Sequence, residues 1–281
     1  MKLRKVTAAS AAVFALALTA TACGGDDGND SGSSSSGGGE KIKIGIKYDQ
    51  PGLGLKTPDG SFTGFDVDVA TYVAKELGYE PDQIEWVETK SADRETALAR
   101  GDVKLIAATY SITDERKQKV DFAGPYLLAH QDLLIKSDAD ISEATDLNDK
   151  KLCSVTGSTS AQNVKKDFAP KAQLSNRGGY SECLSALQNG QVDALTTDDS
   201  ILAGYAAQDA YKGKFKLAGL KLSNENYGIG VKKGDTETVN KVNEALEKMV
   251  SDKSWQKAVE KNFGPANYKN EPAPKIGQLV K

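Results

Sequence analysis

The pattern of apolar and polar residues predicts alternating strands and helices from residue 41 onward. Residues 41–46, KIKIGI, alternate in polarity, which is typical of a strand with one buried face. From Asp66, apolar residues recur at helical spacing until Gly78, which predicts a helix that ends there. A strand over 84–87, a helix over 91–100 and a short buried strand over 105–108 are expected next. This order is typical of a parallel sheet with helices on its faces.

A second α/β unit is predicted to begin with a strand at 151–155, KLCSV, followed by a helix that reaches Lys166. Its later part echoes the first unit, because ALQNGQV at 186–192 parallels ALARGDV at 97–103. In both copies a helical pattern ends at glycine and an apolar strand follows. Eight residues after these glycines stand Thr109 and Asp198. We therefore expect two lobes that each present polar side chains at the carboxyl end of a strand, where open α/β sheets bind ligands.

The last part of the chain predicts one strand and two helices. The strand covers 227–231, YGIGV, and the helical patterns run through 239–249 and around 255–259. Residues 265–281 contain proline, glycine and lysine, and we expect them to be loose.

The first 22 residues have the pattern of a secretory signal peptide, with a basic start and an apolar run over 8–20. Cys23 and Gly24 resemble a bacterial lipoprotein cleavage site, at which the cysteine receives a lipid, although Ala20 stands where leucine is usual. An ordinary cleaved signal with an incidental cysteine is the alternative. Residues 24–39, GGDDGNDSGSSSSGGG, cannot bury apolar surface and are predicted to form a disordered tether that links Cys23 to the folded body.

Composition excludes several large classes of function. The chain has 281 residues and a formal charge of −3, which offers no basic surface for nucleic acid. Its single histidine, His130, would have to support any zinc hydrolase or Ser-His-Asp scheme alone. With Cys23 lipidated, the remaining exported cysteines, Cys153 and Cys183, predict one disulfide, with two buried thiols as the alternative. Neither C-x-x-C nor a Cys/His cluster occurs, so no metal site is expected.

Residues 109–116, TYSITDER, resemble the S-I-T-x-x-R signature of solute-binding proteins that serve ABC importers of polar amino acids. The resemblance extends from Lys41 to about Gly264, with supporting stretches at 49–55, 107–112, 153–159 and 192–198. Within that family, the chain is most similar to the glutamate-binding lipoproteins of Gram-positive bacteria. The resemblance implies a two-lobed periplasmic-binding-protein-like (type II) α/β fold. Lobe 1 would comprise 40–129 plus 225–281, and lobe 2 would comprise 130–224, with hinges near 127–131 and 220–227.

The resemblance also implies a set of ligand-binding residues. Arg116 matches the arginine that holds the ligand α-carboxylate, and a guanidinium suits that role because its parallel donors match a carboxylate. Asp198 matches the acidic residue for the α-ammonium. The remaining matched positions, which would bind these two groups through hydroxyl or backbone atoms, are Thr109, Ser111, Ser158 and Thr159. Read alone, these Ser and Thr residues are more typical of helix caps.

Two basic residues bear on the identity of the ligand. Lys47 follows the first strand, and Arg94 lies in the first turn of the helix after the second. In glutamate-binding relatives the corresponding positions resemble those that hold the side-chain carboxylate, whose buried charge needs a cationic partner. Lys47 stands where some relatives carry arginine, and ordinary surface charges are the alternative for both residues. Residues 49–55 contain no aromatic side chain to stack on a ligand, which favours a small polar acid.

The expected function is therefore capture of L-glutamate by hinge closure and delivery to an ABC permease. The protein would be a monomer without cofactor, metal or enzymatic activity, held at the outer face of the cell membrane by the lipid on Cys23. The same role for glutamine or aspartate is the main alternative. A cyclohexadienyl-dehydratase-like enzyme, with Glu182 as its acid, and a sensory module of the same fold are further alternatives. Tyr180 and His130 are expected at the rim or the hinge.

Overall fold

The computed structural model describes residues 40–281, which form one unit organised around a continuous path of strands. The predicted signal peptide, Cys23 and the tether lie outside the described residues. The path runs in the order β5-β1-β6-β12-β7-β10-β8-β9, with β11 added beside β7, while β2, β3 and β4 form a small separate sheet. The strands are β1 (Ile42–Ile46), β2 (Asp49–Gln50), β3 (Gly54–Lys56), β4 (Phe62–Thr63), β5 (Ile84–Glu88), β6 (Leu105–Ile106), β7 (Val120–Lys136), β8 (Lys151–Val155), β9 (Gln173–Arg177), β10 (Ala194–Asp198), β11 (Phe215–Leu217) and β12 (Asn224–Lys232).

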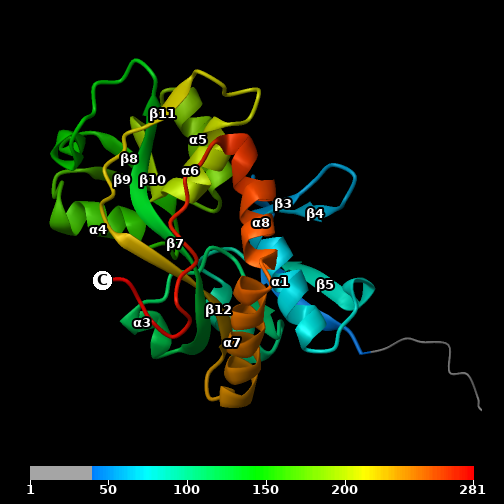
Figure 1. The fold of residues 1–281 in the computed structure, drawn as a ribbon. Helices are drawn as coiled ribbons and strands as arrows, with labels where there is room; N and C mark the ends of the chain where they lie inside the picture. Colours follow the sequence, from blue (N-terminus) through cyan, green and yellow to red (C-terminus); the bar gives the residue numbers. More distant parts are fainter. Residues whose placement is uncertain (1–39) are drawn as a thin grey trace, which may run out of the picture. The chain divides into compact units, whose positions relative to one another are not determined.

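Helices cover the strands of both halves of this path (Figure 1). The α-helices are α1 (Phe65–Glu76), α2 (Arg94–Arg100), α3 (Asp114–Lys117), α4 (Ser160–Asp167), α5 (Tyr180–Gln188), α6 (Asp199–Ala206), α7 (Thr236–Ser251) and α8 (Ser254–Phe263). Short 3₁₀ turns occur at Pro81–Gln83, Ala144–Leu147 and Gly264–Ala266. Within residues 40–281, none of the helices combines the length and the apolar character needed to cross a bilayer.

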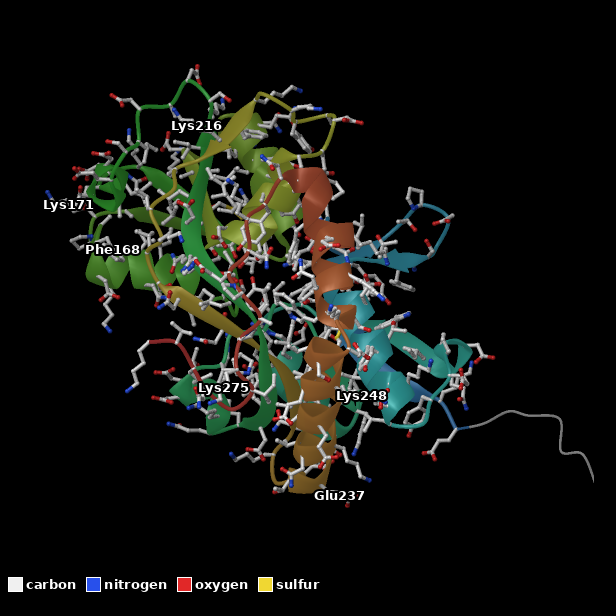
Figure 2. The ribbon with its side chains drawn as sticks, in the orientation of Figure 1. Phe168, Lys171, Lys216, Glu237, Lys248 and Lys275 are labelled. Carbon is white, nitrogen blue, oxygen red and sulfur yellow. A yellow bond between two sulfur atoms is a disulfide. The ribbon has the colours of Figure 1, made fainter. Side chains whose placement is uncertain are left out.

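The first lobe is built on the half of the path that contains β5, β1, β6, β12 and the first part of β7. Strand β1 pairs in parallel with β5 and β6, as the β-α-β-α-β pattern predicts. Helix α1 lies beside α7 and α8, which follow one another along the chain (Figure 1). Phe65 of α1 packs against Trp255 and Phe263 of α8, with ring centroids 6.0 and 5.1 Å apart. On the outer surface, Lys248 of α7 pairs with Glu76 at the end of α1 (Figure 2).

The second lobe is built on β8, β9, β10, β11 and the last part of β7. Here β8 pairs in parallel with β9 and β10, and β10 pairs antiparallel with β7. Its helices are α4, α5 and α6, and apolar residues such as Leu133, Leu147 and Val164 form a buried cluster beneath them. The predicted strand at 151–155, the helix that follows it and the strand ending at Asp198 are confirmed.

Two strands connect the lobes. Strand β7 pairs with β12 up to His130, and from Gln131 onward it pairs with β10. The predicted crossover at 127–131 lies within β7, and the second predicted crossover at 220–227 leads into β12. The two lobes of the predicted fold are confirmed, whereas the division at residues 129/130 and 224/225 stays a prediction.

The expectation of a loose tail at 265–281 was wrong. This segment has little regular structure, but its backbone is bonded to the strands that connect the lobes. Gly277 N–H donates to the carbonyl of Gly124 at 2.9 Å, and Asn226 exchanges two hydrogen bonds with Val280. Lys275 marks this segment in Figure 2, where it lies on the first lobe. Backbone groups make most of these bonds, so the side-chain pattern gave no signal of them.

Candidate solute-binding site

A small polar cavity, with a free volume of about 10 Å³, lies between the two lobes. It contains seven of the eight predicted ligand-binding residues, and Lys47, the eighth, lines an adjoining cavity that shares Ser91 and Tyr180 with it. The lining residues are Ser91, Arg94, Thr109, Ser111, Arg116, Ser158, Thr159, Ser160, Tyr180, Asp198 and Ile201. The structure thus brings the predicted residues together, and their roles in binding stay a prediction.

Arg116 bridges the lobes at this cavity. It lies on α3, a single turn whose start is capped by the Thr113 hydroxyl, which accepts from the Arg116 N–H at 3.2 Å. Its Nη1 donates to the carbonyl of Ser111 at 2.8 Å, and its Nη2 donates across the lobes to the carbonyl of Gly157 at 3.0 Å. Only 7 % of the residue is exposed, so its charge is almost fully removed from water.

Arg94 is buried at the start of α2, and four of its five N–H donors reach backbone carbonyls. Nη1 donates to Ala108 at 3.1 Å and to Thr109 at 3.2 Å, and the guanidinium carbon stands 4.0 Å from the centre of the Tyr110 ring. Burial and the neighbouring Arg116 lower the pKa of Arg94 to about 10. Arg94 lies among the residues that line the cavity, and its role in binding stays a prediction.

Lys47 follows β1 and is buried beside this cluster. Its Nζ donates to the hydroxyl of Ser91 at 2.9 Å, which leaves two of its three N–H donors free of protein partners among residues 40–281. Burial, reinforced by the Arg94 charge, lowers the pKa of Lys47 well below its usual value. A buried cation of this kind is stabilised by a nearby anion.

Asp66, a buried residue that was not predicted to belong to the site, holds the backbone of Thr109 in place. Thr109 has φ 46°, an uncommon backbone conformation for a residue with a side chain. Its N–H donates to Asp66 Oδ2 at 2.9 Å, and Asp66 Oδ1 accepts from the Tyr126 hydroxyl at 2.7 Å. Burial raises the pKa of Asp66 to about 6. An acidic residue inside an apolar helix face was the available signal, but helix N-termini commonly carry acidic residues.

The second lobe contributes an acid and a loop of hydroxyl groups. Asp198 ends β10, is 5 % exposed and accepts a hydrogen bond from the Tyr227 hydroxyl. Burial and the neighbouring Glu225 raise the pKa of Asp198 well above its usual range. A cationic ligand group beside Asp198 would oppose that shift, because an opposite charge favours the ionised carboxylate.

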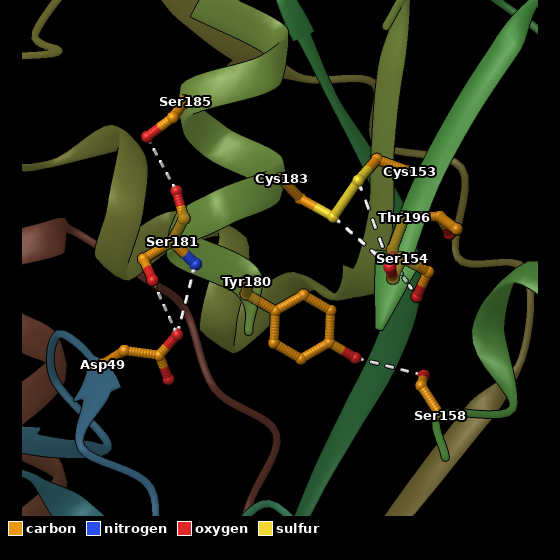
Figure 3. Close-up of a disulfide and its surroundings, with 9 residues drawn as sticks. All are labelled: Asp49, Cys153, Ser154, Ser158, Tyr180, Ser181, Cys183, Ser185 and Thr196. Atoms are coloured by element: carbon orange, nitrogen blue, oxygen red, sulfur yellow. Dashed lines mark hydrogen bonds between the residues drawn. A yellow bond between two sulfur atoms is a disulfide. The ribbon is translucent and has the colours of Figure 1, made fainter. Parts of the chain in front are cut away.

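Tyr180 belongs to the cavity and not only to its rim, and its hydroxyl donates to Ser158 Oγ at 3.1 Å (Figure 3). One turn later on α5, Cys183 forms a disulfide with Cys153 of β8. Their Cα atoms are 5.6 Å apart. The disulfide therefore ties the helix that carries Tyr180 to the strand that leads into the Ser158 loop.

His130 lies at the connection between the lobes, as expected, and outside the cavity. Its ring Nε2 is 3.0 Å from Glu271 Oε1 in the C-terminal segment, and its backbone N–H donates to Asp199. Among residues 40–281, no group of three or more His, Cys, Asp or Glu side chains is placed to hold a metal ion.

The lobes also contact each other beside the cavity. Asp49, which begins β2 in the first lobe, accepts from the backbone N–H and the hydroxyl of Ser181 at 3.2 and 3.0 Å. The Tyr205 hydroxyl of α6 donates to the Asp49 carbonyl at 2.6 Å. A solute held by Arg116 and Asp198 would therefore be enclosed between the lobes.

Comparison with known proteins identifies the family of this chain. Residues 42–265 match the model of bacterial extracellular solute-binding proteins, family 3. The chain belongs to this family. The family member named glutamate-binding protein GluB, from Corynebacterium efficiens, is 48% identical over 272 residues, which cover 93% of this chain and 91% of the relative. The glutamine-binding protein GlnH of Bacillus subtilis is 38% identical over 224 residues and covers 79% of this chain and 81% of the relative.

Solved structures agree with this assignment. An ancestral arginine-binding protein bound to glutamine has a TM-score of 0.74 at 36% identity, covering 80% of this chain and 98% of that chain. The ancestral amino acid-binding protein AncCDT-1, described as a precursor of cyclohexadienyl dehydratase, has a TM-score of 0.70 at 34% identity, covering 79% of this chain and 95% of that chain.

Proposed function

We propose that this family member captures L-glutamate outside the cytoplasm and delivers it to an ABC permease. The observation that carries the proposal is the charge of the cleft. Lys47, Arg94 and Arg116 are 6, 2 and 7 % exposed. Arg116 Nε stands 3.8 Å from Glu95 Oε1, whereas neither Lys47 nor Arg94 forms an ion pair with a carboxylate of residues 40–281. Asp198 is the one acidic side chain that lines the cavity with Arg94 and Arg116, and it is buried, whereas the adjoining cavity at Lys47 is also lined by Asp49, Glu88 and Glu182. L-Glutamate carries two carboxylates and one ammonium, which matches this excess of buried positive charge.

The proposed contacts follow from the positions of the charges. Arg116 would bind the α-carboxylate with help from Ser111 and Thr109, and Asp198 would bind the α-ammonium. Lys47 would bind the side-chain carboxylate with its two remaining N–H donors. Arg94 would act mainly through its charge, because four of its five N–H donors reach backbone carbonyls. Ser158 and Thr159 would close over the ligand from the second lobe.

Relatives named for glutamate and for glutamine support the choice of a polar amino acid with a five-carbon skeleton. The two ligands differ only at the end of the side chain, so Lys47 and Arg94 would decide between them. A lysine with a lowered pKa gains most from an anionic partner, because a neutral amide does not restore its charged form. This favours glutamate over glutamine.

Isothermal titration calorimetry with L-glutamate, L-glutamine and L-aspartate in parallel tests the proposal. Binding of L-glutamate at least tenfold tighter than L-glutamine, which corresponds to about 1.4 kcal/mol, supports Lys47 and Arg94 as carboxylate partners. Equal or tighter binding of L-glutamine would remove those two residues from the specificity determinants.

The proposal includes export and anchoring by a lipid on Cys23. Mass spectrometry of the protein from a bacterial membrane fraction should find the mature chain starting at a diacylated Cys23. A Cys23→Ala variant should appear in the medium instead of the membrane fraction. Retention of that variant in the membrane would contradict the anchoring role of Cys23.

One similar structure, AncCDT-1, supports a dehydratase activity, because it is described as a precursor of cyclohexadienyl dehydratase. The contacts of the cavity argue against it. Its lining is dominated by charged and hydroxyl side chains, and Glu182, the candidate acid, is exposed. Consumption of prephenate by the purified protein would reverse this assignment.

A further inference from the structure

Gln50 carries a hydrogen-bond donor that the protein itself leaves unpaired. Among the described residues, its Nε2 is the one buried side-chain nitrogen or oxygen without a hydrogen-bond partner, and the residue is 0 % exposed. A buried donor without a partner costs about 1–3 kcal/mol, and such groups in native proteins commonly mark a functional position. Neither the family signature nor the candidate ligand set includes this residue.

Gln50 contacts a residue that lines the cavity between the lobes, and it is not itself part of that lining. Its Oε1 accepts from the Thr109 hydroxyl at 3.2 Å, and Thr109 lines the cavity. On the other side, the strand β2 that carries Gln50 contacts α6, the helix that starts directly after Asp198. Gln50 therefore lies on a strand that contacts the second lobe, and its amide is bonded to a candidate site residue of the first lobe.

The Gln50 amide has one side-chain hydrogen bond in the structure, in which Oε1 accepts from the Thr109 hydroxyl. With Oε1 bonded in this way, Nε2 is the amide atom that lacks a partner among the described residues. Thr109 is held in turn by Asp66, whose Oδ2 accepts its N–H at 2.9 Å, and by Arg94, which donates to its carbonyl. This chain of bonds holds a neutral donor beside Thr109, which lines the cavity.

We propose, on the basis of the proposed function, that Gln50 is a ligand-binding residue whose Nε2 donates a hydrogen bond to a carboxylate oxygen of the bound amino acid. The donor is neutral, so it orients a carboxylate without adding to the three buried cations. Its N–H group cannot accept a hydrogen bond from an ammonium, so it favours acidic over basic amino acids. Gln50 lies within residues 49–55, which contain no aromatic side chain that could stack on the ligand.

The test is a Gln50→Glu variant, which keeps an acceptor for the Thr109 hydroxyl, removes the donor and adds a carboxylate. We expect its affinity for L-glutamate in isothermal titration calorimetry to fall at least tenfold. Its melting temperature without ligand should stay equal or rise, because the unpaired donor is gone and the new charge lies near buried cations. Gln50→Met, which removes the donor without adding charge, should also lose at least fivefold in affinity.

Gln173→Glu is the matched control, since Gln173 is exposed on β9 and its substitution makes the same change of charge. It should bind as the wild type does. Affinities of both Gln50 variants within twofold of the wild type would overturn the proposal. A joint loss of melting temperature and affinity in both variants would also overturn it, because the residue would then support the loop and not the ligand.

The wild-type titration separates this inference from the proposed function. If the wild type binds L-glutamine or L-aspartate in preference to L-glutamate, the proposed specificity is wrong, and the variants are compared with that preferred amino acid. A loss of affinity in the Gln50 variants for that ligand would still support the donor role. If the wild type binds none of the three, both the proposed function and the role of Gln50 are overturned.

Discussion

The cleft is lined by buried charged side chains. Among them, Arg116 is expected to contribute most to the affinity for an amino acid. Its guanidinium is the group expected to hold the α-carboxylate that all amino acids share. Replacement by alanine would leave that carboxylate buried without its partner, which costs about 3 kcal/mol, or on the order of 100-fold in affinity. Calorimetric titration of Arg116→Ala with L-glutamate should show this loss, with the far-ultraviolet circular dichroism spectrum unchanged.

Arg100→Ala is the control for that measurement, because Arg100 is exposed at the end of α2 and lines neither cavity. It should bind L-glutamate with the wild-type affinity. Wild-type binding by Arg116→Ala would show that the α-carboxylate is held elsewhere.

Asp66 makes stability depend on pH in a direction opposite to that of a paired surface carboxylate. Its pKa is raised by burial from 3.8 to about 6 in the folded protein. Below pH 3.8 the group is protonated in both states and has no effect, between pH 3.8 and 6 the folded state loses about 3 kcal/mol of stability, and above pH 6 the loss is constant. Asp66→Asn removes this dependence. Urea denaturation should therefore show that the free energy of unfolding of Asp66→Asn, relative to that of the wild type, is higher at pH 7.5 than at pH 4.5.

The comparison of Asp66→Asn with the wild type isolates one group, since the other carboxylates titrate in both proteins. Asp82→Asn, at an exposed position, should give the same stability difference from the wild type at both pH values. A stability difference between Asp66→Asn and the wild type that is independent of pH would mean that Asp66 is not a buried titrating group.

At the scale of elements, the disulfide between β8 and α5 stabilises the second lobe. It closes a segment with a sequence separation of 30 residues, and restriction of the unfolded chain by such a loop is worth about 3–4 kcal/mol. The double variant Cys153→Ala/Cys183→Ala should lose about that much free energy of unfolding in urea denaturation. A reducing agent should lower the stability of the wild type to a similar level and leave the variant unchanged. An equal response of both proteins would contradict the assignment.

The sequence predicted the elements with clear periodicity and missed those formed by distant contacts. The helix at α1 and the strands β1 and β10 follow patterns of one period, and they were predicted within a few residues. Strand β7 was missed as a single 17-residue element, because it is buried along most of its length and therefore shows no alternation. The polar edge strand β9 was missed because its side chains carry little apolar pattern.

The residues of the candidate site also fall into those that the sequence identified and those that it missed. Arg116 and Asp198 were identified because a signature and an internal echo fix their positions next to predicted strands. Gln50 and Asp66 were not assigned to it, because the relevant property of each is a tertiary contact with Thr109, 59 and 43 residues away. No local pattern encodes such a contact. Tyr180 was assigned to the rim because the proximity of its hydroxyl to Ser158 arises only when α5 packs on β8.

The whole molecule encloses its site through contacts between the lobes. Arg116 reaches the Gly157 carbonyl, and Asp49 binds Ser181 and Tyr205. The two crossing strands and the C-terminal segment connect the lobes away from these contacts. Hinge closure around a solute would make and break the contacts at the cavity, while the connections at the crossing strands persist. We therefore expect that a substitution at the contacts between the lobes can impair closure without reducing the stability of the fold.

Gly204 in α6 offers that separation, because a Cβ at this position would overlap the carbonyl oxygen of Pro51 in the other lobe. Within a helix, alanine is more favourable than glycine by about 0.5–1 kcal/mol, so Gly204→Ala should fold with equal or greater stability when the lobes are apart. It should nevertheless lose at least tenfold in affinity for L-glutamate. Small-angle scattering should show a smaller decrease in radius of gyration on ligand addition than in the wild type. Gly264→Ala, whose Cβ would meet no atom within 4 Å, should match the wild type. Full contraction of Gly204→Ala at wild-type affinity would mean that α6 does not approach Pro51 in the liganded protein.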